Sequence, residues 1–379
     1  MTKDGPRLAP LRVAFILPHL DVGGIENNVL QLLRHLDRGR IEPLLYLLRP
    51  TGALRKDLPA DVPCYDGAGR RAMLMPPRLA RWIRSERPDV VMSGTNAANV
   101  MLAVAVRLLA ARDRPKVILS EHTSAQEYFR GAKLPRIRRA LVRRTYPFAD
   151  RLCAPIEALA EEWAGLVAPD RRPDIAVLPN PVLDEDRISG ILTNPPERAR
   201  QRIVSAGRLV RDKGHDVLIA AFQRIAEAYP SATLTIFGSG PQSDALEAQI
   251  ASSGLGHRVL LAGVTRHLPE EFARAGIAAF GSRREGFGNV IVEAMAMGTP
   301  VVATNCVGPR TILKDGALGK VVPADDVESM ARALAESLAH TQPAATRQQA
   351  QDRAMEFTIG RAAAALTDLV ETLTGPRLP

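Results

Sequence analysis

The sequence predicts an α/β protein made of two doubly wound, parallel-sheet domains, and three observations indicate this fold class. Short apolar, β-branched runs alternate with longer stretches of helical periodicity, which is the pattern of parallel α/β architecture. This alternation stops between residues 184 and 200 and then begins again. With 379 residues, the chain is long enough for two domains that each bury a core of their own.

The first series of elements defines the first domain. Apolar runs predict strands at residues 12–17, 43–48, 89–92, 116–120, 151–154 and 175–178. Helical spacing predicts helices at residues 26–36, 77–85, 96–111 and 158–166. We therefore expect residues 1–183 to form an N-terminal Rossmann-like domain.

A linker and a second series follow. Residues 184–200 contain Asn194-Pro195-Pro196 and little periodicity, which predicts a linker. The second domain, residues 201–358, is predicted to have strands at 202–206, 233–237, 258–261, 277–280, 300–303 and 320–322, and helices at 215–228, 243–252, 269–275, 289–297 and 327–340. Residues 359–379 are expected to form a C-terminal helix that packs back on the N-terminal domain. We expect a ligand in a cleft between two facing domains, at the carboxyl ends of the strands.

Composition excludes several classes of protein. An apolar content of 46% is too high for a disordered chain, and the best apolar stretch, residues 100–111, is interrupted by Arg107 and too short for a membrane span. Cys64, Cys153 and Cys306 are far apart, which argues against a disulfide framework or a zinc site. These features predict a soluble protein of the reducing cytoplasm, without a secretory signal.

Two glutamates carry the strongest chemical signal. Glu293 is the only acidic or basic side chain in residues 286–309, and it lies among Val, Ala and Met on a predicted helix. Glu285 stands eight residues earlier, before the turn Gly286-Phe287-Gly288 that leads into the helix at Asn289. Glycines there let a ligand approach backbone N–H groups, and a helix start favours anions. The pair indicates a hydroxyl-rich ligand that carries phosphate, whereas a Glu that packs its stem and hydrates its head is the alternative for Glu293 alone.

This segment resembles the E-x7-E signature of retaining GT-B glycosyltransferases of the family 4 type. Other segments resemble motifs of the same family: Gly207-Arg208-Leu209 with Lys213-Gly214 its G-R-L…K-G turn, Gly238-Ser239-Gly240-Pro241 its G-x-G-P loop, Gly23-Gly24 its N-terminal glycine pair, and residues 298–303 its G-x-P-V-(V/I)-A strand. The resemblance covers essentially the whole second half and is weaker in the first.

The resemblance implies a reaction and its partners. The enzyme would transfer a hexosyl or N-acetylhexosaminyl group from a nucleotide diphosphate-sugar, with a UDP-sugar favoured, and would retain the anomeric configuration. The acceptor would be a glycan or a polyprenyl-diphosphate-linked or other lipid-linked molecule, in the synthesis of cell-envelope polysaccharide or glycolipid. The N-terminal domain would bind the acceptor and the C-terminal domain the donor. No cofactor and no metal are expected.

The resemblance also implies roles for individual residues. The catalytic set comprises Glu285, which contacts the transferred sugar, Arg208 and Lys213, which bind the donor diphosphate, and His122, which contacts the donor. The positions expected to bind the nucleotide-sugar are Gly23, Gly24, Gly238, Gly240, Gly286, Phe287, Gly288, Asn289 and Glu293, the last through the ribose hydroxyls. Asn180-Pro181 resembles the family's P-N-G-V element, with Pro181 in place of the glycine.

Other phosphate-binding motifs do not fit. A P-loop needs Lys and Ser or Thr after its last glycine, whereas Gly214 is followed by His215-Asp216. A dinucleotide fingerprint needs a third glycine, which is missing after Gly240. Two rivals stay open: a nucleotide-sugar epimerase of the same architecture, which the glutamate pair disfavours, and a non-catalytic nucleotide-sugar or lipid-binding scaffold.

A basic segment suggests a further partner. Residues 130–151 hold eight basic residues against one acid, Asp150, and so carry most of the net charge of +9. Apolar residues recur there at helical spacing, as in a helix that binds an anionic membrane surface. We expect peripheral attachment to the inner face of the cytoplasmic membrane, with a solvated charged face as the alternative. Nucleic-acid binding is disfavoured because aromatic residues make up only 4% of the chain.

Overall fold

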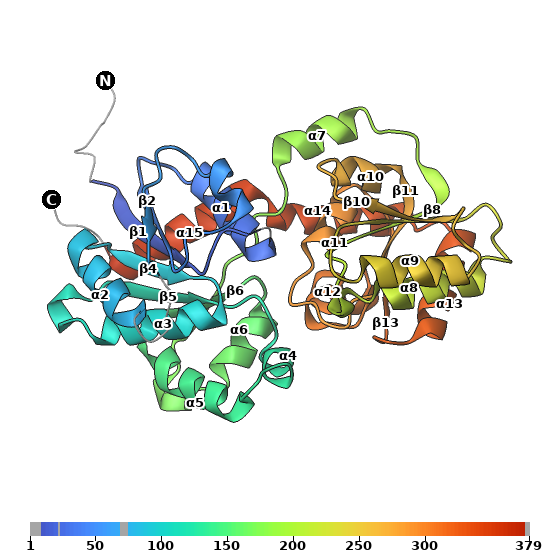
Figure 1. The fold of residues 1–379 in the computed structure, drawn as a ribbon. Coiled ribbons are helices and arrows are strands. Elements are labelled where there is room, and N and C mark those ends of the chain that lie inside the picture. Colours follow the sequence, from blue (N-terminus) through green and yellow to red (C-terminus); the bar gives the residue numbers. More distant parts are fainter. Residues whose placement is uncertain (1–8, 22, 69–74, 376–379) are drawn as a thin grey trace, which may run out of the picture. The chain divides into compact units, whose positions relative to one another are not determined.

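The computed structural model describes residues 9–21, 23–68 and 75–375. They form two compact units, with the described residues up to Pro181 and from Ile359 onward in unit 1, and Val182–Thr358 in unit 2. Each unit contains one wholly parallel sheet with helices packed against it (Figure 1). The predicted pair of doubly wound, Rossmann-like parallel sheets is confirmed.

Unit 1 has a seven-stranded sheet in the order β3-β2-β1-β4-β5-β6-β7. Its strands are β1 (Leu11–Leu17), β2 (Ile41–Leu47), β3 (Cys64–Asp66), β4 (Val90–Ser93), β5 (Lys116–Ser120), β6 (Arg151–Ala154) and β7 (Asp174–Val177). Its helices are α1 (Gly24–His35), α2 (Met75–Glu86), α3 (Asn96–Arg107), α4 (Ala125–Arg130), α5 (Pro135–Thr145), α6 (Glu157–Ala164) and α15 (Ile359–Thr374).

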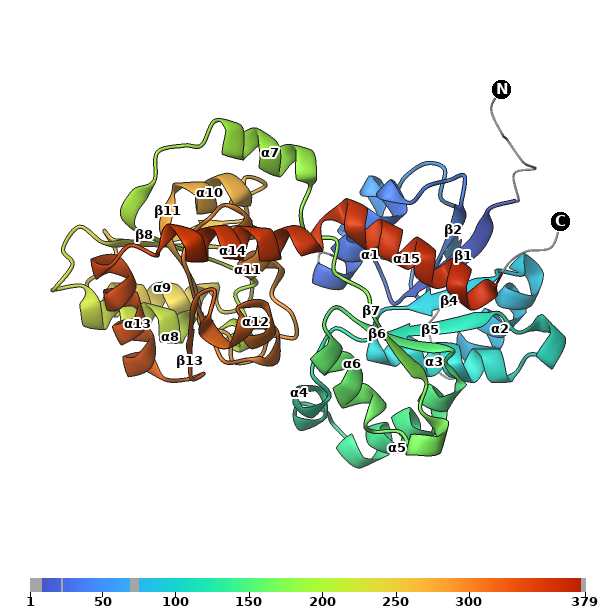
Figure 2. The same cartoon turned by 180° about the vertical axis from the view of Figure 1, so that it is seen from behind.

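Both faces of this sheet are buried, which explains why its strands are continuous apolar runs. Along β1, Ala14 and Ile16 enter the core that α2 and α3 cover, whereas Phe15 and Leu17 enter the core that α1 and α15 cover. Figure 2 shows α15 running across the sheet beside α1, with which it is in contact. The last helix of the chain is therefore part of the core of unit 1.

Unit 2 has a six-stranded sheet in the order β10-β9-β8-β11-β12-β13. Its strands are β8 (Ala199–Ala206), β9 (Thr233–Phe237), β10 (Val259–Gly263), β11 (Ala275–Phe280), β12 (Val301–Thr304) and β13 (Lys320–Val322). Its helices are α7 (Glu185–Thr193), α8 (His215–Ile225), α9 (Ser243–Ser252), α10 (Leu268–Arg274), α11 (Asn289–Ala296), α12 (Val307–Ile312), α13 (Val327–Ala339) and α14 (Ala344–Ala354).

Several elements were not predicted from the sequence, including the six-residue helices α4 and α12. Three others have a clear physical reason. The expected linker contains helix α7, whose start is capped by the Asp184 side chain accepting from the Arg187 N–H at 3.1 Å. Helix α14 is polar in sequence, so it lacked a periodic apolar signal, although Ala350 and Ala354 are buried. Strand β3 is three residues long and pairs at the edge of the sheet with β2, so it has no apolar run to reveal it.

Within the described part of the chain, no helix combines the length and the hydropathy that a membrane span requires.

Close backbone packing in unit 2 yields a stability prediction. A Cβ at Gly276 in β11 would lie 1.9 Å from the carbonyl oxygen of Arg200, where the pairing of β11 with β8 shifts register. We expect Gly276→Ala to lower the free energy of unfolding by roughly 1–3 kcal/mol, as overpacking does. Gly256→Ala is the matched control, because nothing lies within 4 Å of its Cβ position. Urea denaturation of both variants measures the difference, and equal stability would contradict the packing argument.

Candidate active site

The carboxyl edge of the unit 2 sheet carries most of the predicted site residues. The strand order reverses between β8 and β11, and in open α/β sheets ligands bind at the carboxyl ends of the strands at such a point. The segment after β8 contains Arg208 and Lys213, and the segment after β11 contains Glu285 and leads into α11. The topology therefore gathers motifs that are more than 70 residues apart in sequence at one edge.

Lys213 and Glu285 form an ion pair at this edge. The Lys213 Nζ donates a hydrogen bond to Glu285 Oε2, and both side chains are mostly buried. Lys213 belongs to a short 3-10 turn (Arg211–Lys213) that ends at Gly214, whose φ of +58° favours glycine. A Cβ at Gly214 would also lie 1.9 Å from the carbonyl oxygen of Gly281. This backbone contact brings the two segments together and places the ammonium beside the carboxylate.

A second set of ion pairs fixes the same two segments. Arg284 pairs with Asp212, and the Arg283 guanidinium makes bonds of 2.8 and 2.7 Å to the two oxygens of Asp216. The Arg283 N–H also donates to the Asp212 carbonyl at 2.8 Å. The sequence analysis did not assign these residues, although the run Arg283-Arg284-Glu285 and the nearby Asp212 and Asp216 were a visible signal of opposite charges.

Arg208 differs from these cations in its surroundings. Its side chain is exposed, and no other side chain or carbonyl in the described ranges pairs with its guanidinium. Five N–H donors in a planar fork suit a phosphate oxygen pair well. The geometry leaves Arg208 able to bind an anion, whereas Lys213 already shares its charge with Glu285.

Backbone packing explains the glycines of the loop Gly238-Ser239-Gly240-Pro241. A Cβ at Gly238 would lie 1.9 Å from the Gly207 carbonyl oxygen, and one at Gly240 would lie 2.5 Å from the Leu209 carbonyl oxygen. The Leu209 N–H donates to the Ser239 carbonyl at 2.9 Å, so the chain continues to pair beyond the ends of β8 and β9. Gly238 and Gly240 are thus required by backbone packing, and their role in nucleotide binding stays a prediction.

The residues at the turn into α11 differ in backbone conformation and in burial. Gly288 caps α11 with a φ of +105°, and Asn289 is the first helical residue. Phe287 is buried with its ring 5.0 Å from that of Phe357, so a role in ligand binding would fall to its backbone. Gly286 is buried beside it.

Glu293 lies one turn into α11 and is partly buried. Burial raises the pKa of its carboxyl to about 7, although the positive charge of Arg187 opposes that shift. Burial disfavours the charged form of this carboxyl, because the ionised group loses hydration. The sequence singled out Glu293 as a carboxylate on an apolar helix, and its contact with the ribose hydroxyls stays a prediction.

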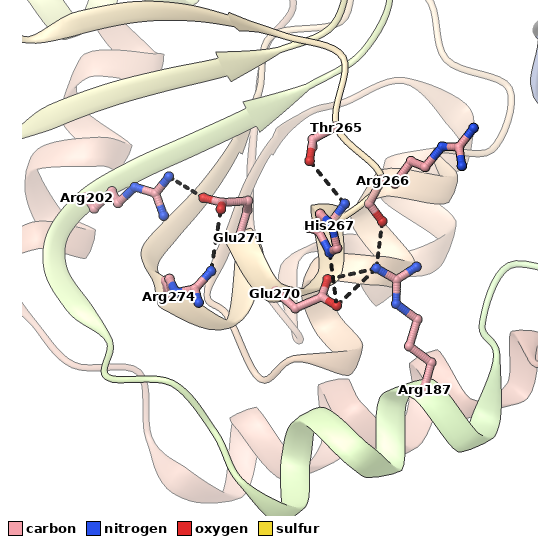
Figure 3. A network of polar contacts seen from close by, with 8 residues as sticks. All are labelled: Arg187, Arg202, Thr265, Arg266, His267, Glu270, Glu271 and Arg274. Carbon is pink, nitrogen blue, oxygen red and sulfur yellow. Dashed lines mark hydrogen bonds and ion pairs between the residues drawn. The ribbon is translucent and has the colours of Figure 1, made fainter.

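Arg187 is a residue that the sequence analysis missed. It projects from α7 towards α10, where its Nη2 donates to the Glu270 carboxylate at 2.8 and 3.1 Å and to the Arg266 carbonyl at 2.6 Å (Figure 3). A neighbouring cluster joins Glu271 to Arg202 and Arg274. Arg187 lies in the segment predicted to be a linker, where no periodic pattern indicated a helix.

Unit 1 places its predicted residues at the equivalent edge of its own sheet, whose order reverses between β1 and β4. Gly23 precedes α1 in an extended conformation, and Gly24 is the first residue of α1 with nothing within 4 Å of its Cβ position. No strained turn requires glycine at either position. A Cβ at Gly23 would lie 2.2 Å from Glu26 Oε2, which is the end of a flexible side chain, whereas the contacts at Gly238 and Gly240 are with backbone carbonyl oxygens.

His122 follows β5 and lines a small cavity beneath α1. The cavity has a volume of about 20 Å³, and Ser120, Asn180 and Pro181 also line it. The His122 Nε2 lies 3.1 Å from Ser120 Oγ. Burial lowers the pKa of His122 to about 4, against the opposing effect of a hydrogen bond with the Asn180 side chain, so the imidazole is neutral at pH 7. The structure brings His122 and Asn180 together.

Comparisons with known proteins agree with this geometry. A family model described as Glycosyltransferase Family 4 matches residues 22–186, and one described as Glycosyl transferases group 1 matches residues 200–340. The crystal structure of HepE from Anabaena in complex with UDP superposes with a TM-score of 0.76 at 21% identity, covering 96% of this chain and all of that one. The two parallel sheets thus define the GT-B fold.

Similarity to characterised proteins shows the family to which this chain belongs. A GDP-mannose-dependent alpha-(1-6)-phosphatidylinositol monomannoside mannosyltransferase of Mycolicibacterium smegmatis is 31% identical over 71% of this chain and 72% of its own length. An exopolysaccharide phosphotransferase of Streptomyces coelicolor is 34% identical over 68% of this chain, which spans only 25% of that protein. The chain belongs to the family 4 glycosyltransferases.

The raised pKa of Glu293 generates a prediction. The folded protein keeps this proton up to about pH 7, whereas the unfolded chain loses it near pH 4.5, the ordinary pKa of a glutamate. Glu293 therefore lowers stability progressively as the pH rises from about 4.5 to about 7. We expect Glu293→Gln to gain stability relative to the wild type between pH 5 and pH 8, by about 1–3 kcal/mol. Urea denaturation at the two pH values tests this, and a difference that does not change with pH would contradict it.

Proposed function

We propose that this protein transfers a sugar from a nucleotide diphosphate-sugar to a glycan or lipid-linked acceptor with retention of anomeric configuration. Membership of family 4 supports glycosyl transfer. The observation that carries the assignment of the site is the Lys213–Glu285 pair at the carboxyl edge of the unit 2 sheet, beside the exposed Arg208.

The proposed reaction breaks the bond between the anomeric carbon and the diphosphate oxygen. The electron pair of that bond leaves with the nucleoside diphosphate, and the acceptor hydroxyl forms the new bond on the same face of the sugar. The departing phosphate accepts the hydroxyl proton, so no separate base is needed. Negative charge grows on the diphosphate, which Arg208 and Lys213 stabilise as preorganised cations.

The glutamates serve hydroxyl groups in this proposal. Glu285 accepts hydrogen bonds from the transferred sugar while it orients Lys213, with which it is already paired. Glu293 accepts from the ribose hydroxyls, and the charge of Arg187 favours its ionised form. His122, neutral through burial, contacts the sugar as a hydrogen-bonding group. The backbone N–H groups at the start of α11 complete the anion site.

The similar proteins suggest a donor and an acceptor, which we propose for this protein. The HepE structure contains UDP, whereas the mycobacterial relative is GDP-mannose-dependent, so we propose a UDP-sugar first and GDP-mannose as the competing donor. That relative acts on a phosphatidylinositol mannoside, which supports a membrane glycolipid or an envelope polysaccharide as acceptor. Metal independence stays a prediction.

Lys213→Ala tests the site. Loss of one preorganised cation is expected to lower kcat by roughly 10²–10³-fold. Lys320→Ala is the matched control, because Lys320 also pairs with a glutamate, Glu336, but lies at the start of β13. Sugar transfer and thermal unfolding are measured for both variants, with UDP-sugars and GDP-mannose, with and without acceptor. An unchanged kcat in Lys213→Ala would refute the assignment, and an epimerised donor without acceptor would favour an epimerase.

The second partner that we propose is an anionic membrane surface at helix α5. Only Val142 and Thr145 of this helix are buried, and Leu134, Ile137 and Leu141 are 65%, 56% and 41% exposed. Ile137 and Leu141 are four residues apart and lie on one face of α5, and Leu134 immediately precedes the helix. An apolar stripe on a basic helix is typical of a helix that lies in a lipid interface.

The arginines of α5 fall into two groups. Arg138 and Arg139 stack over the rings of Tyr128 and Phe129, at 5.4 and 5.0 Å from the ring centroids. Arg136, Arg143 and Arg144 have no ion pair, hydrogen bond or ring contact through their side chains in the parts of the chain that the structure describes. These three are therefore available for lipid phosphates. Peripheral attachment to the inner face of the cytoplasmic membrane would bring a lipid-linked acceptor to unit 1.

A flotation experiment tests this partner. Replacing Arg136, Arg143 and Arg144 by Gln is expected to weaken binding to phosphatidylglycerol vesicles by roughly a hundredfold, because each cation contributes about 1 kcal/mol at an anionic surface. Arg224→Gln is the control, because Arg224 is an exposed arginine of helix α8 in unit 2. Phosphatidylcholine vesicles should bind neither protein. Equal flotation of the triple variant and the wild type would overturn the proposed surface.

A further inference from the structure

Glu121 is a buried carboxyl group that the proposed reaction does not use. It follows β5 directly, and its side chain is only 2% exposed. Ser120 and His122 on either side of it line the cavity beneath α1, whereas Glu121 does not. Instead, Glu121 Oε1 accepts hydrogen bonds from the Tyr146 hydroxyl, from Asn99 Nδ2 at 2.8 Å and from Asn96 Nδ2 at 3.4 Å.

The donors to Glu121 are themselves fixed. Asn99 Nδ2 also donates to the Ser120 carbonyl at 2.9 Å, and Asn99 Oδ1 accepts from Ser93 Oγ at 2.5 Å. The Glu121 backbone N–H donates to the Cys153 carbonyl at 2.8 Å. The network therefore joins the ends of β4, β5 and β6 with the first turn of α3.

The other side of His122 is held by the same group of residues. The ring of Tyr146 stacks on that of Trp163, with centroids 5.9 Å apart and planes 24° apart. Trp163 Nε1 donates to the Thr123 carbonyl at 2.7 Å. The backbone before His122, at Ser120, and the backbone after it, at Thr123, are thus both tied to the cluster around Glu121 and Tyr146.

Keeping a carboxyl group at this position is costly. Burial raises the pKa of Glu121 to about 7, even though the three donors oppose the shift. An apolar side chain would avoid this cost but would leave the Tyr146 hydroxyl without its acceptor. It would also leave Asn99 Nδ2 to donate to the Ser120 carbonyl and Asn96 Nδ2 to donate to the Tyr146 hydroxyl, each without the carboxylate oxygen. A fully hydrogen-bonded polar cluster specifies one arrangement of the loop more strictly than apolar packing does.

We propose that Glu121 is a positioning residue that, through Tyr146, Asn96 and Asn99, fixes the loop that carries His122. This inference rests on the proposed function, in which His122 contacts the sugar. Tyr146 directly follows α5, and Val142 and Thr145 anchor that helix beside it. The cluster therefore also ties the His122 loop to the base of the helix that we propose as the membrane contact.

A double-mutant cycle tests the proposal. Glu121→Leu removes the acceptor oxygen, His122→Asn removes the imidazole, and the full-length chain carries each change alone and both together. Glu121→Leu is expected to lower kcat/KM roughly tenfold in the wild-type background and to have no further effect in His122→Asn. Its effect on the free energy of unfolding is expected to be the same in both backgrounds. Glu121→Gln, which keeps an acceptor oxygen, should retain most of the activity.

A second variant keeps the test valid if Glu121→Leu does not fold. Tyr146→Phe removes only the hydroxyl donor and is expected to lower kcat/KM severalfold, again only when His122 is present. Tyr229→Phe is its matched control, because the Tyr229 hydroxyl donates to the Ala335 carbonyl at 3.0 Å in unit 2.

The outcomes separate the two proposals. Additive losses of activity in the cycle, or wild-type activity in Glu121→Leu and Tyr146→Phe, would overturn the positioning role while leaving His122 in the site. Wild-type activity in His122→Asn would overturn the role of His122 in the proposed function, and with it the positioning role. A loss that depends on His122 supports both.

Discussion

The candidate site depends on backbone segments that approach each other too closely for any side chain at the contact. The carbonyl oxygens of Gly207 and Gly281 lie where a Cβ of Gly238 or Gly214 would be, 1.9 Å from each Cβ position. These contacts hold the segments after β8, β9 and β11 together at the carboxyl edge of the sheet. Because parallel strands all end at the same edge, short loops deliver their polar groups to one place. The glycines that resemble a phosphate-binding motif thus also allow the close backbone contacts between the loops of the candidate site.

Several of the charged side chains at this edge are paired with a side chain of opposite charge. Lys213 is paired with Glu285, and Arg284 with Asp212. A partly buried charge needs such a partner, since it has lost much of its hydration. Arg208 departs from this rule and stays exposed. In the proposed reaction the incoming diphosphate brings the negative charge that Arg208 lacks.

Three protonation states follow from burial rather than from neighbouring charge. Glu121 and Glu293 have pKa values raised to about 7, and His122 has one lowered to about 4, each with desolvation as the largest cause. The consequences differ with the surroundings. Glu121 has three donors from its own unit and is proposed to position a loop. Glu293 experiences the positive charge of Arg187 and is proposed to bind the hydroxyl groups of a ligand. The same physical effect therefore supports positioning in one place and binding in another.

The sequence by itself determined the parallel α/β class and most strands and helices, because buried parallel strands are continuous apolar runs. Its local motifs also led to the proposal of Arg208, Lys213, Glu285 and Glu293 as site residues, which stays a prediction. It did not reveal β3, α7 or α14, whose sequences lack an apolar periodic signal. Only the tertiary structure paired Lys213 with Glu285 and Arg187 with Glu270, and gave Glu121 its donors, since these contacts join residues between 22 and 83 positions apart. Such pairings depend on strand order and on burial, which no local stretch of sequence encodes.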